Sequence, residues 1–402
     1  MYHNNKFRLP AWYVYCVLGE LVLIYPTYLI MMESSGISPF GLASLLAIWA
    51  GTTLVFEVPS GVFGDLFNRK TVLIAGAAIE ACAFVTWLLF PNFWGFALGF
   101  TIWSFGSSLA SGTAEAYLYE ALDDQAVFQK VYGRTEAVSS GAVAVALLTG
   151  GILAETGFTL PLLLSSLAPI GAAVVVWLFL PPASNAKTDD EPEGVWVSFA
   201  TTLRSGIKAI SNSPRLLFLI LAPATLGALT GVLEEFVGVI FAELSFSLTI
   251  VGLIYAGVWF ARTIGSLCAE HLPPSLYLPL LLSLLGCALL ALFSYVADPL
   301  WVIFAMMFLF GVSGIVDVIY GAQIQNKVDD DHRATVTSIG SMALEVNAIV
   351  GFFLFGYLAQ ADSGDSQWFV LLQAAAWIGL GLSVVWMLQC RLTQQIHDQD
   401  PA

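Results

Sequence analysis

The sequence predicts an all-α integral membrane protein with twelve transmembrane helices in two pseudo-symmetric six-helix bundles. Of its 402 residues, 58% are hydrophobic and 11% are charged, and the mean hydropathy is +0.82. Ordinary globular domains carry roughly 25% charged residues. The apolar residues also form runs of about 20 residues, which is the length that a helix needs to span a bilayer. A β-barrel would instead show short alternating segments.

We count twelve such runs along the chain. They cover approximately residues 11–32, 40–62, 71–90, 93–119, 133–155, 159–181, 215–241, 247–269, 275–297, 299–322, 334–360 and 367–390. The first run is long and is followed by Met-Met-Glu rather than by a small-residue cleavage site. We therefore expect it to stay as the first helix and not to be removed as a signal peptide.

The basic residues are distributed unevenly over the loops. All of them except Arg262 lie in the N-terminus, in even-numbered loops or at their helix edges, or in the C-terminus. Cytoplasmic loops carry the excess of Lys and Arg in membrane proteins. Both termini are therefore expected to be cytoplasmic. The formal net charge is −15, and we expect no nucleic-acid partner.

One long polar connection, residues 182–214, divides the chain. It contains an acidic run and then Val195 to Ile210, which is amphipathic at helical spacing. Such a segment is typical of a helix that lies along a membrane surface. We expect a bundle over residues 1–181, a cytoplasmic linker with this helix, and a second bundle over residues 215–402.

The two halves resemble each other in the placement of charge, which indicates an internal repeat. An acid follows a Ser-Gly pair at the same offset, Glu115 in the fourth run and Asp317 in the tenth. The fifth run opens with Arg134 and the eleventh with Arg333. The repeat breaks between the eighth and ninth runs, where Glu270–Pro274 replaces a basic pair. Any gate should therefore be stronger in the N-terminal half.

A tight polar turn, Glu57–Lys70, joins the second and third runs. Gly61, Asp65, Arg69 and Lys70 stand in it at offsets of zero, four, eight and nine. With these residues the turn resembles the loop signature of the major facilitator superfamily, Gly-x-x-x-Asp-Arg-x-Gly-Arg-Lys. The resemblance implies two parallel six-helix halves with a substrate site near the midplane between them.

Two positions depart from this signature, Leu66 in place of Arg and Asn68 in place of Gly. Asn accepts a left-handed backbone more readily than other non-Gly residues, so we expect the turn to survive. Acids and bases at these helix ends could lock one conformation through ion pairs and carbonyl contacts. The alternative is that the bases only mark the cytoplasmic side. The expected cytoplasmic gate comprises Gly61, Asp65, Arg69, Lys70, Glu115, Glu120, Arg134 and Arg333.

Two strings, Glu-Val-Pro-Ser-Gly from Glu57 and Ser-Gly-Thr-Ala-Glu-Ala-Tyr-Leu-Tyr-Glu from Ser111, look similar to bacterial exporters of this superfamily. They favour the drug or metabolite exporter-like branch. Two signs of proton-coupled drug exporters are reduced, because the fourth run has no base before its Ser-Gly pair and the fifth keeps only Gly141, Gly150 and Gly151 of its pattern. Those glycines still permit close helix packing.

Ionisable residues inside membrane spans are costly, roughly 2.5 to 3.5 kcal/mol at the centre on insertion scales, so each needs a partner or a function. The candidates for proton or substrate binding are Glu20, Glu345, Glu234, Glu235, Arg262 and Asp317, with Tyr25 beside the first. Glu20 lies midway along the first run, before an expected kink at Pro26. It is a good place to bind a proton or a cation, or, alternatively, to form a structural hydrogen bond.

The other candidates differ in how they could act. The adjacent Glu234 and Glu235 cannot share one helix face, so at most one should point into a cavity while the other nears the extracellular interface. Arg262 needs a counter-ion or an anionic ligand, and Asp317 and Glu345 are the first acids to test. Glu80 in the third run is expected to make a structural hydrogen bond.

Other chemistry finds little support. The cysteines Cys16, Cys82, Cys268, Cys287 and Cys390 stand singly, without a metal spacing or a CxxC pair. Neither an ATP-binding motif nor a nucleophile triad is visible. We therefore expect no enzyme activity, no cofactor and no metal site, and transport driven by a gradient.

The leading hypothesis is a secondary transporter that exports a small amphipathic or cationic molecule in exchange for protons by alternating access. The alternatives are proton symport or facilitated uptake of a small metabolite, and, from another class, a receptor or scaffold that does not transport. The expected partners are a small-molecule substrate, protons and the lipid bilayer. We expect a monomer in the bacterial inner membrane.

Overall fold

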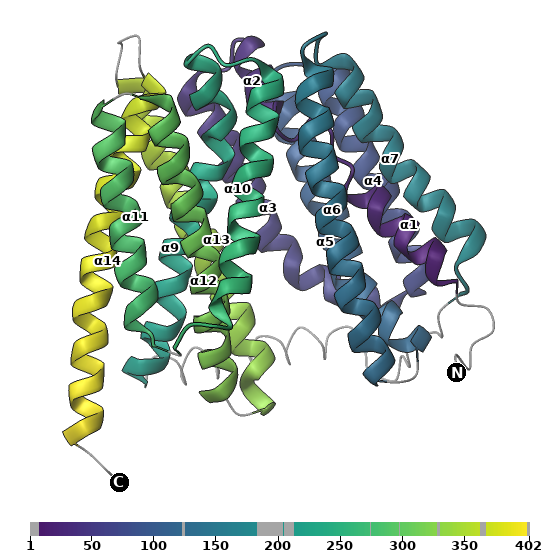
Figure 1. Cartoon of the computed structure of the whole chain (residues 1–402). Coiled ribbons are helices and arrows are strands. Elements are labelled where there is room, and N and C mark those ends of the chain that lie inside the picture. The colour runs from purple at the N-terminus through teal and green to yellow at the C-terminus, as the bar shows by residue number, and fades with distance from the viewer. Residues whose placement is uncertain are drawn as a thin grey trace. The chain divides into compact units, whose positions relative to one another are not determined.

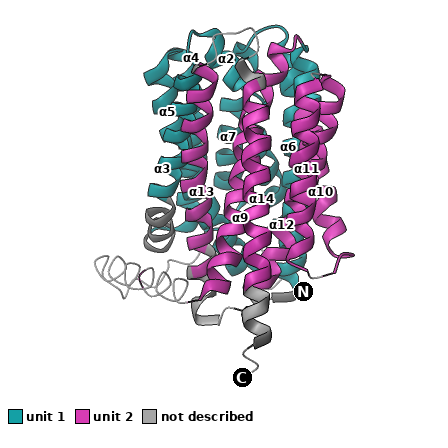
Figure 2. Cartoon of the chain, turned by 90° about the vertical axis from the view of Figure 1, so that its left-hand side faces the viewer, with its two compact units in different colours: residues 1–195, 246–253 teal, residues 196–245, 254–402 magenta. Residues whose placement is uncertain are grey.

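The computed structural model describes residues 8–122, 125–182, 204, 213–273, 275–296, 298–327, 330–361 and 367–399. Within these residues it contains α-helices and no strand (Figure 1). The helices divide into two compact units, coloured separately in Figure 2. The all-α class predicted from the sequence is confirmed.

Unit 1 comprises residues 1–195 and 246–253. Its helices are α1 (Leu9–Glu20), α2 (Tyr28–Ser34), α3 (Pro39–Leu66), α4 (Arg69–Leu89), α5 (Phe93–Leu122), α6 (Gln125–Ala154) and α7 (Thr159–Phe179). α4 packs against α5 and α7, α3 against α5, and α1 lies beside α7 (Figure 1). The core around α1 contains Trp12, Tyr117 and Ala172, all nearly inaccessible.

Unit 2 comprises residues 196–245 and 254–402. Its helices are α9 (Pro214–Glu243), α10 (Leu248–Ala269), α11 (Tyr277–Val296), α12 (Pro299–Lys327), α13 (Asp330–Ala361) and α14 (Gln367–Gln399), and the first residues of α10 group with unit 1. α9 packs against α12, α13 and α14, and α11 packs against α12 and α14. The core of this unit includes Phe218, Tyr320 and Cys390.

Ten of the described helices are long and apolar enough to cross a membrane. α5 is not among the ten, because it has 30 residues but carries many Ser, Gly and Trp residues, which lower its hydropathy. Large apolar side chains also cover the outside, such as Trp94, Leu300 and Phe260, which are 78%, 73% and 67% exposed. Within these helices the backbone N–H and C=O groups bond to one another, as the bilayer requires.

The first predicted span is not one kinked helix. The chain leaves the helix after Glu20 and resumes at Tyr28, so the break begins well before Pro26. Two contacts stabilise the unwound segment: Ile24 donates its N–H to the Ser165 hydroxyl at 3.0 Å, and a Cβ added at Gly150 of α6 would collide with the Leu23 carbonyl. The tertiary partner Ser165 and local turn bonds, such as Tyr25 N–H to the Val22 carbonyl at 3.1 Å, satisfy backbone groups that the helix would otherwise pair.

The polar turn predicted over Glu57–Lys70 is shorter than expected, because α3 continues to Leu66 and α4 begins at Arg69. Asn68 has φ −59° and ψ 120°, not a left-handed backbone, and its side chain accepts the Lys70 N–H at 3.1 Å as the N-cap of α4. Asn is a preferred N-cap residue because its side-chain oxygen satisfies an unpaired N–H of the first turn. Asn68, at the position where the family signature has Gly, therefore caps the start of α4.

Some predictions fall outside the described residues. Most of the linker 182–214 does so, including the amphipathic stretch apart from Arg204. The backbone at Glu57, Gly61 and Asp65 lies in α3 and that at Arg333 lies in α13, but their side chains are not described.

Candidate functional site

Unit 1 contains a cavity of about 470 Å³. It is lined from α1, α3, α4, α5, α6 and α7, and its polar lining includes Glu20, Glu80, Glu115 and Glu136. Among the described residues that line it, none is Lys, Arg or His. The cavity is therefore an acidic space that favours protons and cations over anions.

Glu20 is the last residue of α1, and Val22 of the unwound segment also lines the cavity. The Glu20 side chain is exposed on the cavity wall. A helix C-terminus carries partial negative charge from carbonyl groups that lack intrahelical partners. Half-helix ends of this kind coordinate cations in transporters built from broken helices. The break in the first span thus places a carboxylate and a negative helix end at the same point.

Glu80 of α4 occupies another part of the cavity wall. Its Oε1 accepts the Trp103 Nε1–H of α5 at 3.0 Å. The helices carrying these residues cross with their backbones in contact, because a Cβ at Gly106 would lie 2.8 Å from the Gly76 carbonyl oxygen and 2.9 Å from the Glu80 nitrogen. Only Gly at this crossing brings α5 close enough to hold Glu80 in this position. The hydrogen bond expected for Glu80 is present, and its carboxylate also lines the cavity.

Aromatic rings form much of the remaining wall. Trp49 of α3 stacks on Trp103 with centroids 5.7 Å apart and an interplanar angle of 21°. Trp87 of α4 is buried and does not line the cavity, but it meets Trp103 edge-on at 5.9 Å. On another side, Trp12 donates to the Thr135 hydroxyl at 3.0 Å. Tryptophans that are far apart in the sequence therefore converge here, an arrangement that the sequence pattern did not indicate.

The sequence analysis did not assign two of the lining acids, Glu115 and Glu136, to this cavity. Glu115 was expected at a cytoplasmic gate, and its side chain lines this cavity. Glu136 of α6 was missed. It lies one helical turn from Tyr132 and from Ser139, which also line the cavity. This polar spacing of four and three residues is the signal that could have identified it.

The two bases of the polar turn join three helices of unit 1. Arg69 forms an ion pair with Glu120 and donates to the Ala116 carbonyl of α5 at 3.3 Å. Lys70 Nζ donates to the carbonyls of Trp177 and Leu180 at 2.9 and 2.7 Å. A cation at these carbonyls is favourable because they form the negative end of α7.

Arg134 of α6, another expected member of the gate, is exposed. No described contact joins it to the bases of the turn.

In unit 2, Arg262 of α10 donates to Asp317 of α12 at 2.8 Å. Their side chains are 44% and 43% exposed. Asp317, one of the two acids that the sequence analysis names for this role, is therefore the counter-ion of Arg262. The pair is formally neutral, so this acid differs from its counterpart Glu115 in unit 1.

The adjacent acids of α9 are both buried, with 7% and 6% exposure for Glu234 and Glu235. Trp259 donates to Glu234 Oε1 at 2.8 Å, and Tyr255 donates to the Glu235 carbonyl at 3.1 Å. Two side chains of α10 therefore reach α9 at this level, one at each of the adjacent acids. Burial of both side chains does not test the prediction that one of them nears the extracellular interface, which concerns depth along the helix.

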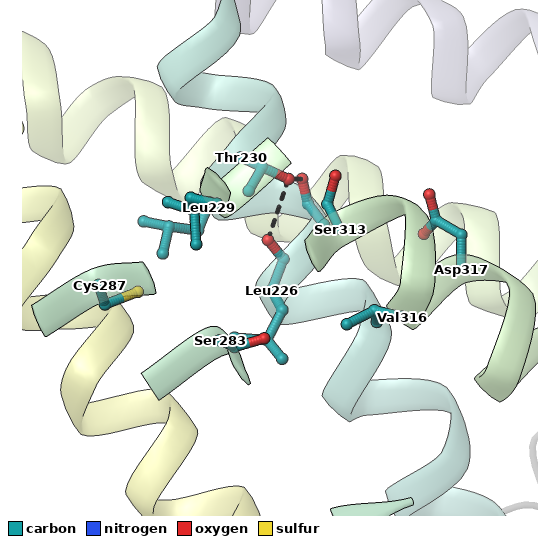
Figure 3. A pocket seen from close by; sticks show the side chains of 10 residues that line it. Leu226, Leu229, Thr230, Ser283, Cys287, Ser313, Val316 and Asp317 are labelled. Carbon is teal, nitrogen blue, oxygen red and sulfur yellow. Dashed lines mark hydrogen bonds between the residues drawn. The ribbon is translucent and has the colours of Figure 1, made fainter. Parts of the chain in front are cut away.

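Unit 2 also contains a small cavity of about 10 Å³ between α9, α11 and α12. Figure 3 shows Thr230 and Ser313 close together on its wall, with Asp317 one turn beyond Ser313. Thr230 donates to the Leu226 and Gly227 carbonyls at 3.3 and 3.0 Å. This volume is near the lower limit for one water molecule, so the cavity is too small for an organic substrate.

The remaining candidates lie elsewhere. Glu345 of α13 is half-buried and does not line either of these two cavities. Tyr25 lies in the unwound segment, with its ring 5.8 Å from that of Tyr28. In the described part of the chain, no three His, Cys, Asp or Glu side chains come together as metal ligands.

A loop contact connects α6 to the start of α10. Glu155, just beyond α6, accepts the Thr249 backbone N–H at 2.8 Å. This hydrogen bond lowers the pKa of the Glu155 carboxyl below its ordinary value of 4.5. Nearby, a Cβ at Gly252 would lie 2.5 Å from the Leu147 carbonyl oxygen, so the two backbones are in contact.

The sequence pattern of the Major Facilitator Superfamily (MFS) matches residues 15–352. The chain is 23% identical over 326 residues to the uncharacterised MFS-type transporter YxaM of Bacillus subtilis (strain 168), covering 79% of this chain and 80% of that protein. It is 27% identical over 220 residues to the inner membrane transport protein YajR of Escherichia coli (strain K12), covering 53% and 46%.

Among solved structures, a substituted form of the nucleoside transporter NupG matches with a TM-score of 0.79 and 13% identity, covering 95% of this chain and 98% of that one. At this identity the likeness concerns the fold alone. The fold, the polar cavity and the match over most of the sequence lead to one conclusion. The chain belongs to the major facilitator superfamily and is a multi-pass membrane transporter, not an enzyme.

Proposed function

We propose that this transporter is a proton-coupled exporter of a small cationic or amphipathic molecule, with the cavity of unit 1 as its binding site. The observation that carries the proposal is that four carboxylates line the cavity without a base among the described lining residues. Glu20, at the end of the broken first helix, is the residue assigned to carry the proton or the positive charge of the substrate.

The coupling follows from the cost of charge in a membrane. An ionised carboxylate that is neither protonated nor paired is costly to bury. A carboxylate that holds either a proton or a cation is neutralised in both cases, and the two compete for it. Protons carried inward and cations carried outward by the same residue would constitute antiport.

The polar turn supplies the proposed cytoplasmic gate. Arg69 and Lys70 hold α4 to the ends of α5 and α7 through an ion pair and carbonyl contacts. Asp65 and Arg333 complete the proposed gate from the sequence pattern. In unit 2, the neutral pair of Arg262 and Asp317 is assigned a structural role, and Glu345 is retained as a second proton carrier.

The proposed location is the bacterial inner membrane, as for YajR, whose name describes it as an inner membrane transport protein. The charge distribution of the loops favours cytoplasmic termini. We propose that the protein acts as a monomer, because each helix bundle supplies its own core.

The test is transport in proteoliposomes under an imposed pH gradient, with a panel of organic cations and neutral metabolites. Cation efflux from the cytoplasmic side should follow the proton gradient, and Glu20→Gln should abolish the coupling. Glu270→Gln, an exposed loop acid, is the matched control and should behave as the wild type. Flux that ignores the gradient in the wild type would reject coupling.

The direction of coupled movement separates export from its alternative. Accumulation of substrate together with protons would establish symport, the runner-up. A protein that exchanges none of the panel, and whose cysteine-labelled cavity stays accessible from one side only, would be a receptor or scaffold.

A further inference from the structure

We propose that Glu80, Trp103 and Trp49 form a cation subsite within the unit 1 cavity, which takes the protonated amine or quaternary ammonium group of an aromatic substrate. The inference rests on the proposed function, in which this cavity is the transport site. It assigns two roles to two carboxylates: Glu20 exchanges the proton, and Glu80 recognises the substrate.

The first support is the way Glu80 is held. Trp103 donates a hydrogen bond to Oε1 at 3.0 Å. The backbone contact of Gly106 with Gly76 and with the Glu80 nitrogen fixes the helix that carries the carboxylate. A carboxylate fixed at both its backbone and one oxygen loses little side-chain freedom when a ligand binds, and such preorganisation improves affinity.

The second support is the rigidity of the aromatic wall. Trp103 is only 8% exposed, because Trp49 stacks on it and Phe84 packs against it with centroids 5.2 Å apart. Trp103 is therefore a positioning residue for Glu80. Trp49 is more exposed and lines the cavity itself, so it is the ring available to a ligand.

The third support is the chemistry of this combination. A cation beside an aromatic ring is attracted by the ring quadrupole, and a nearby carboxylate supplies the counter-charge. Among the described lining residues there is no Lys, Arg or His whose positive charge would already neutralise this carboxylate. Anionic substrates would meet four acids and no base there, which disfavours them.

Glu20 and Glu80 are suited to different roles by their surroundings. Glu20 stands at a helix end on the exposed cavity wall, whereas Glu80 accepts a hydrogen bond from a nearly buried ring. Glu80, held in place by Trp103, is therefore assigned to contact with the ligand, and Glu20, beside the break in the first span, to exchange of the proton.

The experiment uses the full chain in lipid nanodiscs and two probes of the same shape. The cationic probe is N-methylacridinium, and the uncharged probe is acridine at a pH above its pKa. Binding of each is measured by calorimetry. The readout is the ratio of the two affinities, which a purely structural defect would not change.

The wild type should prefer the cation. Glu80→Gln should lower its affinity for the cation by about tenfold or more, because the ionised acceptor is lost, and leave that for acridine within a factor of about two. Glu80→Asp should restore part of the preference. Trp103→Phe keeps an aromatic ring but removes the donor, and should reduce the preference several-fold. Trp49→Ala should weaken both probes.

Two control variants remove the same side-chain types elsewhere. Trp94→Phe alters a ring that is 78% exposed, and Glu270→Gln alters an acid whose side chain is 70% exposed. Both should match the wild type. Melting temperatures of all variants identify any that fail to fold, and in that case Glu80→Asp alone decides the role of the carboxylate.

Three results would overturn the inference: equal affinities for the two probes in the wild type, an unchanged ratio in Glu80→Gln, or an equal loss for both probes in that variant. Failure of the proposed function would differ from all three. The preference for the cation and its loss in Glu80→Gln would remain, but flux in proteoliposomes would not respond to protons. Conversely, proton-driven flux of another molecule without cation preference would refute the subsite alone.

Discussion

Replacing Gly106 by Ala tests whether the crossing of α4 and α5 organises the site. The new methyl group would lie 2.8 Å from the Gly76 carbonyl oxygen and 2.9 Å from the Glu80 nitrogen. Both are backbone atoms, so the helices must separate rather than a side chain rotate. Overpacking of this kind costs about 1 to 3 kcal/mol.

For a unit of this size, each kcal/mol lowers the melting temperature by about 2 to 4 °C. Gly106→Ala should therefore melt roughly 2 to 12 °C below the wild type in detergent. It should also weaken cation binding, because Trp103 moves away from Glu80.

Gly112→Ala is the matched control on the same helix. No atom lies within 4 Å of a Cβ at this position, and Ala favours a helix over Gly by up to about 1 kcal/mol. This variant should melt at or slightly above the wild type. Equal melting temperatures for the two variants would refute the argument that backbone contact at Gly106 holds the site together.

Three further predictions address other contacts. Ser165→Ala leaves the buried Ile24 N–H in the break of the first span without its acceptor and should lower the free energy of unfolding by about 1 to 3 kcal/mol. Ser166→Ala removes only a hydrogen bond within its own helix and should cost less. The reverse order of melting temperatures would contradict this account of the break. The pKa of Glu155 is lowered in the folded state, so its contribution to stability should be present above its ordinary pKa and disappear as the pH falls through the folded value. Glu155→Gln should therefore be less stable than the wild type at neutral pH but not in acid. A loss of equal size at both pH values would count against the hydrogen bond from Thr249 as the cause. The exposed pair of Arg262 and Asp317 should contribute only about 0 to 1 kcal/mol in a double-mutant cycle of melting temperatures, and a larger coupling would point to a partner outside the described contacts.

Ten of the membrane spans could be predicted because length and apolar composition decide them locally. The break in the first span could be predicted only in part. Pro26 indicated a kink, but the position of the break depends on Ser165, which is 141 residues away from its partner Ile24. Contacts of that separation leave no pattern in a single sequence.

The cavity shows the same division between local and tertiary information. The acidity of Glu20 and its depth in the membrane indicated a site before the structure was known. Glu136 lies close to the start of a predicted span, where a charge is inexpensive, so its depth did not single it out. Trp49 and Trp103 looked scattered in the sequence because only the packing of α3 on α5 brings them together.

The roles of the polar turn remain proposals, but its local chemistry followed from the residue types. A base near a helix C-terminus was expected to bind carbonyls, and Lys70 does so at the end of α7. The helix cap at Asn68 was not foreseen, because the resemblance to the family signature favoured a Gly-like turn over a helix start.

The most direct test of the central claim is whether protons are released when a transported cation binds to the purified protein. This release is measured by calorimetry in buffers of different ionisation enthalpy. If a carboxylate of the unit 1 cavity exchanges its proton for the substrate, the wild type should release protons at a pH where Glu20 is protonated, and Glu20→Gln should release fewer or none. Cation binding to the wild type without proton release at any pH would contradict the account.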